Sequence, residues 1–374
     1  MITRPRPRWL LASLIAAFLT ASGCAGSSTK QDTPTSSGKK AAGTAKVIPP
    51  ASTTRSSVPT SAASQATIVP VTEGTTVAAP GRYAVGALQE IYIDRSRKTK
   101  RNRSAPEKPE RTLPALILYP AQGSPGFEKQ TINAKAQDGP WPLVVFSHGV
   151  TGSGPAYATT LRVLASAGYV VIAPDYPLSK GNADGGPVVT DVAEQTRDVA
   201  FLIDQLLAAS KATSGPFAGL IDSGRIGLAG HSLGAITSLG AGYNACCTDA
   251  RIKAVAEWAG IFFPLESKGK VAPSSKGRPL LILHGTDDKT VNYRFGRAVY
   301  ALLGAPKYFI TLPGTGHVVS YIQGVGTPQS KVVTLATIDF FDRYLKGDRG
   351  GISRLHSVVA AAGTSAATEQ EQPG

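Results

Sequence analysis

From about residue 81 onward, short apolar runs alternate with segments in which apolar residues recur every three or four positions. Alternating runs of this kind predict an α/β domain. The connections after residue 143 are long enough for helical crossovers, so the sequence predicts a mostly parallel sheet covered on both faces. We expect strands at 84–93, 113–119, 143–147, 169–173, 226–229, 254–258, 280–284 and 307–312. Helices are expected at 156–167, 191–208, 233–242, 293–303 and 331–345.

The two ends of this pattern differ from its middle. The first two expected strands are separated only by the charged segment 94–111, which is too short for a helical crossover and favours an antiparallel edge hairpin. Residues 349–374 lack the periodic pattern and are expected to be a disordered tail. The catalytic or binding domain is therefore expected at 81–348.

The N-terminus has the features of an export leader. Arginines at positions 4, 6 and 8 precede an apolar run at 9–19 and the small residues 21–23. The run is shorter than the roughly 20 residues that a transmembrane helix needs. Small residues directly before Cys24 resemble a bacterial lipoprotein cleavage site, although Ala21 stands where leucine is usual. The resemblance implies a signal peptide at 1–23 and a lipidated Cys24 on the outer face of the cell membrane; a plain signal peptide and secretion are the alternative.

Residues 24–80 are expected to form a disordered tether. From 25 to 80 there is no Phe, Trp or Tyr, and Ser, Thr, Ala, Pro and Gly dominate. Adjacent Cys246 and Cys247 could pair only in a strained ring, so we expect two unpaired, buried side chains.

The net charge of +14 is unevenly distributed. Residues 1–24 contribute +3, residues 25–80 another +3 and residues 95–111 +6, so the rest of the chain is close to neutral. A nucleic-acid-binding protein should carry its charge as a basic face of the folded domain. The distribution instead indicates a leader, a tether and one surface loop, and we expect no nucleic-acid partner.

A serine between two glycines lies where an expected strand meets an expected helix. The run 226–229 leads into Gly230-His231-Ser232-Leu233-Gly234. Such a nucleophile elbow strains the serine backbone and requires neighbours without side chains. Ser232 is therefore the candidate nucleophile; a purely structural glycine turn is the alternative. His231 is expected to be a packing residue.

A serine hydroxyl needs a base, and in this kind of sheet an acid and then a histidine follow along the chain. The glycine-rich segment 313–317 follows the last expected strand and ends in His317, the candidate base. Asp287 and Asp288 follow the strand at 280–284. His148, His284 and His356 are expected to be structural or solvated, and their scattered positions indicate no metal site.

These residues together resemble the α/β-hydrolase superfamily, over about residues 83–345, and within it the branch of polyester hydrolases, chlorophyllases and platelet-activating-factor acetylhydrolases. The family pattern His-Gly-x-x-Asp-x-x-Val matches residues 284–291, which implies that Asp288 is the acid. The acetylhydrolases carry their acid one strand earlier, where this chain has Glu257, the second candidate. The acid would orient the imidazole and stabilise its protonated form.

The family resemblance also implies two oxyanion donors. The glycine-rich loop at 149–154 follows an apolar strand, and the resemblance makes the Val150 N–H the first donor. The second would be the N–H of Leu233, which follows the nucleophile. The loop lacks the Lys-Ser/Thr ending of a phosphate-binding loop, so no cofactor is expected.

The sequence thus predicts a serine-dependent carboxylic ester hydrolase. Family lids usually interrupt the chain at a position where this sequence has only residues 265–278, so no large cap is expected. An open cleft favours a lipid-like or polymer-like ester as substrate, and we expect a monomer. A serine peptidase or acyltransferase of the same fold, and a catalytically inert envelope lipoprotein that uses the fold for binding, are the alternatives.

Overall fold

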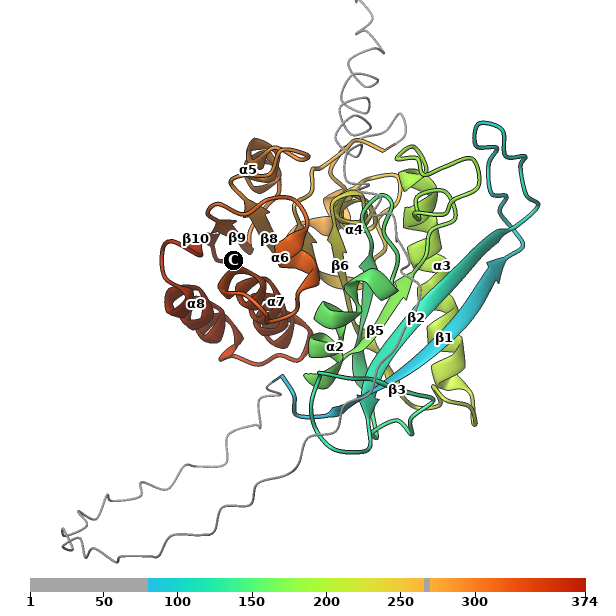
Figure 1. Ribbon diagram of the computed structural model, residues 1–374, viewed down its shortest axis with the longest axis horizontal. Helices are drawn as coiled ribbons and strands as arrows, with labels where there is room; N and C mark the ends of the chain where they lie inside the picture. Colours follow the sequence, from blue (N-terminus) through green and yellow to red (C-terminus); the bar gives the residue numbers. More distant parts are fainter. Residues whose placement is uncertain (1–79, 266–269) are drawn as a thin grey trace, which may run out of the picture.

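The computed structural model describes residues 80–265 and 270–374, which form a ten-stranded sheet with helices on both faces (Figure 1). The strand order is β10-β9-β8-β7-β6-β4-β5-β2-β1-β3. The predicted leader at 1–23, Cys24 and all of the tether except residue 80 lie outside the described residues.

The first two strands form the predicted antiparallel hairpin. Strands β1 (Ala84–Asp94) and β2 (Arg111–Ala121) pair along their full length, and β3 (Thr131–Ile132) adds a two-residue edge. β2 joins the hairpin to the rest of the sheet through antiparallel pairs with β5.

The middle of the sheet is parallel, as predicted. Its strands are β4 (Trp141–Ser147), β5 (Val170–Pro174), β6 (Ile221–His231), β7 (Ile252–Trp258), β8 (Leu280–Gly285) and β9 (Lys307–Leu312). Ser147 at the end of β4 pairs with Gly230 of β6, and Gly230 pairs with Glu257 of β7. The loops that follow these strands therefore meet at one edge of the sheet, where α/β proteins build their sites.

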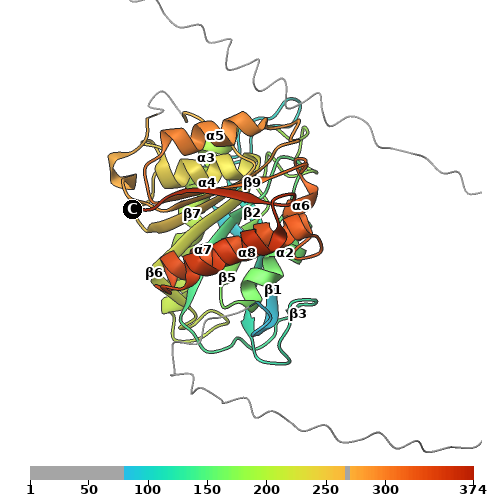
Figure 2. The same cartoon turned by 90° about the vertical axis from the view of Figure 1, so that its left-hand side faces the viewer.

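Helices cover both faces of the sheet (Figure 2), and each face has its own apolar core. On one face lie a short 3-10 helix and four α-helices: η1 (Pro155–Tyr157), α2 (Ala158–Ser166), α6 (Val319–Ile322), α7 (Pro328–Leu345) and α8 (Gly351–Ala362). On the other lie α3 (Val192–Lys211), α4 (Leu233–Tyr243) and α5 (Tyr293–Leu302). The five predicted helices are all present, within a few residues of the expected bounds.

The end of the chain is ordered, so the prediction of a disordered tail at 349–374 was wrong. Helix α8 packs on α7 and buries Leu355 and Val359, which are one helical turn apart. Arg354 adds ion pairs to Asp339 and Asp342 of α7. Strand β10 (Thr368–Gln372) then pairs antiparallel with β9, although all five of its side chains are exposed. Backbone hydrogen bonds form this strand, so no apolar alternation marks it in the sequence.

The basic segment 95–111 is more than a solvated surface loop. The Arg111 side chain is completely buried and binds the carboxylates of Asp191 and Asp198 on the neighbouring α3 segment. Arg97 binds Asp94 and also Asp198. Much of the positive charge of this segment is therefore neutralised by acidic side chains from elsewhere in the domain.

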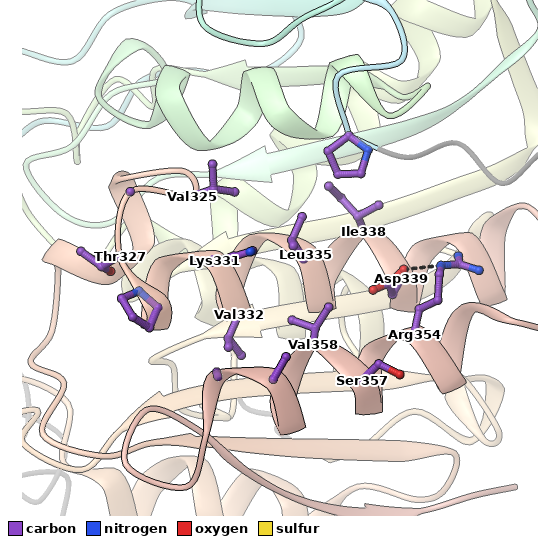
Figure 3. A pocket seen from close by; sticks show the side chains of 15 residues that line it. Val325, Thr327, Lys331, Val332, Leu335, Ile338, Asp339, Arg354, Ser357 and Val358 are labelled. Carbon is purple, nitrogen blue, oxygen red and sulfur yellow. Dashed lines mark hydrogen bonds and ion pairs between the residues drawn. The ribbon is translucent and has the colours of Figure 1, made fainter. Parts of the chain in front are cut away.

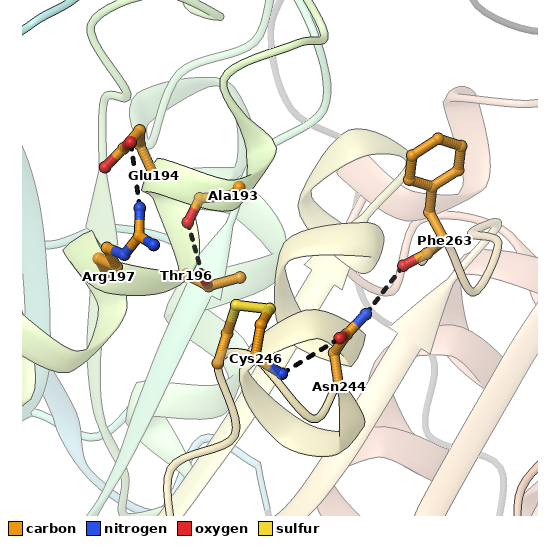
Figure 4. The surroundings of a disulfide bond; sticks show 8 residues. Ala193, Glu194, Thr196, Arg197, Asn244, Cys246 and Phe263 are labelled. Carbon is orange, nitrogen blue, oxygen red and sulfur yellow. Dashed lines mark hydrogen bonds and ion pairs between the residues drawn. A yellow bond between two sulfur atoms is a disulfide. The ribbon is translucent and has the colours of Figure 1, made fainter. Parts of the chain in front are cut away.

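Cys246 and Cys247 form a disulfide bond, which corrects the expectation of two unpaired side chains (Figure 4). They lie in a turn after α4, where the N–H groups of Cys247 and Thr248 both donate to the carbonyl oxygen of Asn244. The buried Asn244 side chain also donates to the carbonyl oxygen of Phe263. The disulfide bond thus lies within this turn. The Asn244 side chain attaches the turn to the segment that follows β7.

No large cap covers the described part of the chain. Lids of this fold usually lie in the connection from β7 to β8. In this chain the described portion of that connection contains only loop residues and η3 (Pro273–Ser275). Among the described residues, none of the helices combines the length and apolarity needed to cross a bilayer.

A cavity of about 870 Å³ lies between α7 and α8 (Figure 3). Apolar side chains such as Leu335, Ile338 and Val358 line most of it, and Pro80 is also among its lining residues. The described chain therefore begins beside these two helices. None of the candidate catalytic residues lines this cavity.

Candidate active site

Ser232 occupies the sharp turn between β6 and α4. Its backbone has φ 56° and ψ −118°, a strained conformation for a residue with a Cβ atom, of the kind that costs about 1–3 kcal/mol. The Ser232 N–H donates to the carbonyl oxygen of Trp258, and its own carbonyl accepts from Ala235 and Ile236 in the first turn of α4. The surrounding strand and helix thus hold the strained residue in place.

The two glycines of the motif make this turn possible. A Cβ atom at Gly230 would overlap the carbonyl oxygen of Gly234, and one at Gly234 would overlap the carbonyl oxygen of Ser147 on β4. Helix α4 can therefore start against β4 only if both positions lack a side chain. This is the steric requirement that the sequence motif predicts.

The structure brings Ser232, His317 and Asp288 together from three separate loops. The Ser232 Oγ lies 2.8 Å from His317 Nε2, and His317 Nδ1 lies 2.6 Å from Asp288 Oδ2. The Ser232 side chain is nearly buried, and the Asp288 side chain is fully buried. With the hydroxyl donating to Nε2 and Nδ1–H donating to the carboxylate, the imidazole is held in the tautomer that can accept the serine proton.

Asp288 is fixed at both carboxylate oxygens. Oδ1 accepts hydrogen bonds from the N–H groups of Thr290 and Val291, each 2.8 Å long. Oδ2 faces His317 and lies 3.5 Å from His284 Nε2. Burial alone would raise the pKa of Asp288, but the nearby His284 imidazole, the hydrogen bond with His317 and the backbone N–H groups outweigh it and hold the pKa well below its ordinary value. The carboxylate therefore stays ionised at neutral pH.

The two other candidate acids do not contact His317. Asp287 is exposed, and among the described residues its carboxylate accepts only from the adjacent Thr286 hydroxyl at 3.2 Å. Glu257 is buried in β7, where Oε2 accepts from the Gly260 N–H at 2.8 Å. Burial raises the pKa of Glu257 to about 7. Of the three carboxylates, only Asp288 has the geometry to orient the imidazole.

The loop after β4 lies against Ser232. A Cβ atom built on Gly149 would be 3.2 Å from the Ser232 Cβ, so the backbone before Val150 is in close contact with the nucleophile candidate. The Thr151 and Gly152 N–H groups are used by Ser179 and Gly149. Within residues 80–265 and 270–374, the Val150 N–H donates to no protein acceptor. It is thus free to serve the predicted oxyanion role.

Leu233 supplies the second predicted donor. It is the first residue of α4, and the N–H groups in the first turn of a helix have no acceptor within the helix. The positive end of the helix dipole adds to its attraction for a negative oxygen. The structure therefore places a potential donor directly after Ser232, as the motif predicts.

His231 and Tyr157 make hydrogen bonds in this site that the sequence did not predict. His231 is buried and packs on Tyr321, as expected, and in addition its Nε2 lies 2.6 Å from the His317 carbonyl oxygen and its Nδ1 lies 2.7 Å from the Tyr157 hydroxyl. His231 was visible inside the glycine motif, whereas no local pattern marks Tyr157. The described residues contain no cluster of three or more side chains suited to bind a metal ion.

Fold and site geometry define the class: this chain has the α/β-hydrolase fold. Residues 144–264 match the model of the alpha/beta hydrolase family. A solved ferulic acid esterase from Streptomyces cinnamoneus has a similar fold, with a TM-score of 0.54 and 22% identity over 73% of this chain and 93% of that one.

Two curated proteins are distant relatives in sequence. "Acyl-protein thioesterase 1 homolog 2" of Dictyostelium discoideum is 26% identical over 44% of this chain and 78% of its own length. "Putative esterase YitV" of Bacillus subtilis strain 168 is 26% identical over 54% of this chain and 89% of its own length. The chain is therefore similar to hydrolases that are named for ester and thioester substrates.

Proposed function

We propose that this protein is a serine-dependent carboxylic ester hydrolase. The observation that carries the proposal is the unbroken hydrogen-bonded series from Ser232 Oγ through His317 to the buried Asp288 carboxylate. The esterase and thioesterase names of the relatives support the same chemistry.

The reaction follows from the positions of these groups. Ser232 Oγ attacks the ester carbonyl carbon while its proton passes to His317 Nε2. The negative oxygen of the tetrahedral intermediate is stabilised by the N–H groups of Val150 and Leu233. His317 then protonates the leaving alcohol, and the acyl group stays on Ser232. Water, activated by the same imidazole, releases the acid and restores the serine.

An apolar cluster beside the two predicted donors supports a substrate with an apolar group next to the ester. Leu233 and Ile236 are buried in it, and the partly exposed Val150, Ile261 and Phe263 pack against them, together with the two disulfide-bonded cysteines. Because no large cap covers the domain formed by residues 80–265 and 270–374, the remainder of the substrate would extend away from it. We therefore propose a lipid-like or polymer-like ester as the substrate class. We also propose that the protein acts as a monomer.

A fluorophosphonate probe tests the activated serine directly. We expect the full-length protein to be labelled at Ser232, as located by peptide mass spectrometry. In His317→Ala the labelling rate should fall by about a hundredfold or more, because no general base remains. Absence of labelling in a folded wild-type sample would contradict the proposal and favour an inert binding protein. A labelled protein that hydrolyses amides faster than esters would favour a peptidase, and one that transfers the acyl group to an added alcohol rather than to water would favour an acyltransferase.

We also propose that the chain is exported and anchored through a lipid on Cys24, which lies outside the described residues. Palmitate labelling in a bacterial host, with and without globomycin, tests this. We expect wild type to carry the label and to accumulate unprocessed with globomycin, whereas Cys24→Ala should carry none. Secretion of unlabelled wild-type protein would mean that the leader is a plain signal peptide.

A further inference from the structure

Tyr157 and His231 lie between the loop that carries Val150 and the loop that carries His317. Both side chains are almost fully buried, with 4% and 2% exposure, so their polar atoms depend on protein partners. The Gly149 N–H lies 3.3 Å from the Tyr157 hydroxyl, which lies 2.7 Å from His231 Nδ1. His231 Nε2 in turn lies 2.6 Å from the carbonyl oxygen of His317. A continuous series of hydrogen bonds therefore joins the two loops.

The position of every proton in this series is fixed. The His317 carbonyl oxygen can only accept, so His231 Nε2 must carry a hydrogen. Burial lowers the pKa of His231 to about 3, so the ring is neutral and Nδ1 accepts from the Tyr157 hydroxyl. Burial likewise raises the pKa of Tyr157 to about 12, which keeps the phenol protonated. The Tyr157 oxygen then accepts from Gly149, and all partners are satisfied.

Ring packing restricts the same two side chains. Tyr157 in η1 packs on Phe146 of β4, with ring centroids 4.7 Å apart. His231 stacks at 4.8 Å on Tyr321 of α6, the short helix that follows His317. His231 is the residue directly before Ser232 in the chain. The hydrogen-bonded series therefore fixes the positions of both loops relative to the backbone of the nucleophile candidate.

We propose that Tyr157 and His231 are positioning residues that set the His317 loop and the oxyanion loop relative to Ser232. The proposal rests on the proposed ester hydrolysis, since it concerns the same site. Both side chains are buried and are bonded to protein groups, so His231 would act through the backbone of His317 and Tyr157 through Gly149, the residue before Val150. Their loss should therefore lower the rate of the chemical step more than the affinity for the ester.

The test uses Tyr157→Phe, His231→Leu and His231→Gln in the full-length protein. Kinetics on p-nitrophenyl butyrate should show kcat lowered by about tenfold in Tyr157→Phe and in His231→Leu, the effect of about 1.4 kcal/mol, with KM changed by less than about twofold. The Kd of a boronic acid that forms a tetrahedral adduct at Ser232 should rise by a similar factor. His231→Gln keeps a side-chain N–H for the His317 carbonyl and should retain most of kcat.

A double-mutant cycle separates positioning from general loss of stability. Because the two residues act in series, Tyr157→Phe/His231→Leu should be no slower than His231→Leu alone. Tyr243→Phe is the matched control: it also removes a buried hydroxyl, but one bonded to Arg278 and Pro279 at the far end of α4. It should leave kcat and the boronic acid Kd unchanged.

Several outcomes would overturn the inference without touching the proposed function. In an active wild-type enzyme, unchanged kcat in Tyr157→Phe would remove Tyr157 from the mechanism. Additive losses in the cycle would mean that the two residues act independently. If His231→Leu does not fold, Tyr157→Phe and His231→Gln still decide the matter. An inactive wild-type enzyme would instead refute the ester hydrolase proposal itself.

Discussion

Replacing Ser232 by alanine is expected to lower kcat/KM for p-nitrophenyl butyrate by about a thousandfold or more. Among the described residues, the Ser232 hydroxyl is the group that hydrogen-bonds to His317 Nε2, at 2.8 Å, and it is the one that would carry the acyl group. Alanine has the same Cβ atom and therefore meets the same backbone strain at φ 56°, so the fold should be retained. Steady-state kinetics, with circular dichroism and thermal unfolding on the same samples, check both parts.

Ser238 provides the matched control for this substitution. It lies six residues further along the chain in α4, is fully buried, and its hydroxyl has no hydrogen-bond partner among the described residues. Removing an unpaired hydroxyl should be close to neutral for stability, so Ser238→Ala should keep both the fold and the activity. Ester hydrolysis that survived in Ser232→Ala would refute the assignment of the nucleophile.

The turn around Ser232 could be predicted because its constraints are local in sequence. Gly230 and Gly234 are needed where the backbone of β4, β6 and α4 meet, and the strand before and the helix after the motif have clear apolar patterns. The same locality explains why the parallel strands were found: each is an apolar run that must be buried on both faces.

Features that depend on distant partners could not be predicted in this way. Strand β10 has five exposed polar side chains and exists because its backbone pairs with β9. Arg111 belongs to a basic run in sequence, yet it is buried because Asp191 and Asp198 reach it from about 80 residues away. The contact of Tyr157 with His231 likewise spans 74 residues. Such pairs become visible only when the sheet brings their loops together.

The choice of the catalytic acid among the three candidate carboxylates depends partly on local sequence and partly on contacts with distant residues. Asp287, Asp288 and Glu257 all follow or end apolar strands, so periodicity alone leaves them as alternatives, and the family resemblance favours Asp288. The structure separates them by contact: Asp288 binds the imidazole, Asp287 faces solvent and Glu257 binds the Gly260 N–H. A one-residue difference in a loop thus decides which side chain can act on His317.

Asp288→Asn is expected to lower kcat by about a thousand- to ten-thousandfold, whereas Asp287→Asn should stay within about twofold of wild type. Thr290 and Val291 donate to Oδ1, so the asparagine oxygen should take that position and the amide nitrogen should face His317. The imidazole Nδ1 must then accept, which moves the proton to Nε2. With a proton on Nε2, His317 cannot take the proton of Ser232.

The same pair of variants makes a prediction for stability against pH. Because the pKa of Asp288 in the folded protein is below its ordinary value of 3.8, its ionised form stabilises the fold above that pH, and this contribution is lost as the pH falls further. Asp288→Asn should therefore lose part of the acid-induced drop in melting temperature below about pH 4, and Asp287→Asn should not. Parallel melting curves and kinetics decide between the two residues: an activity loss in Asp287→Asn with an active Asp288→Asn would reverse the assignment of the acid.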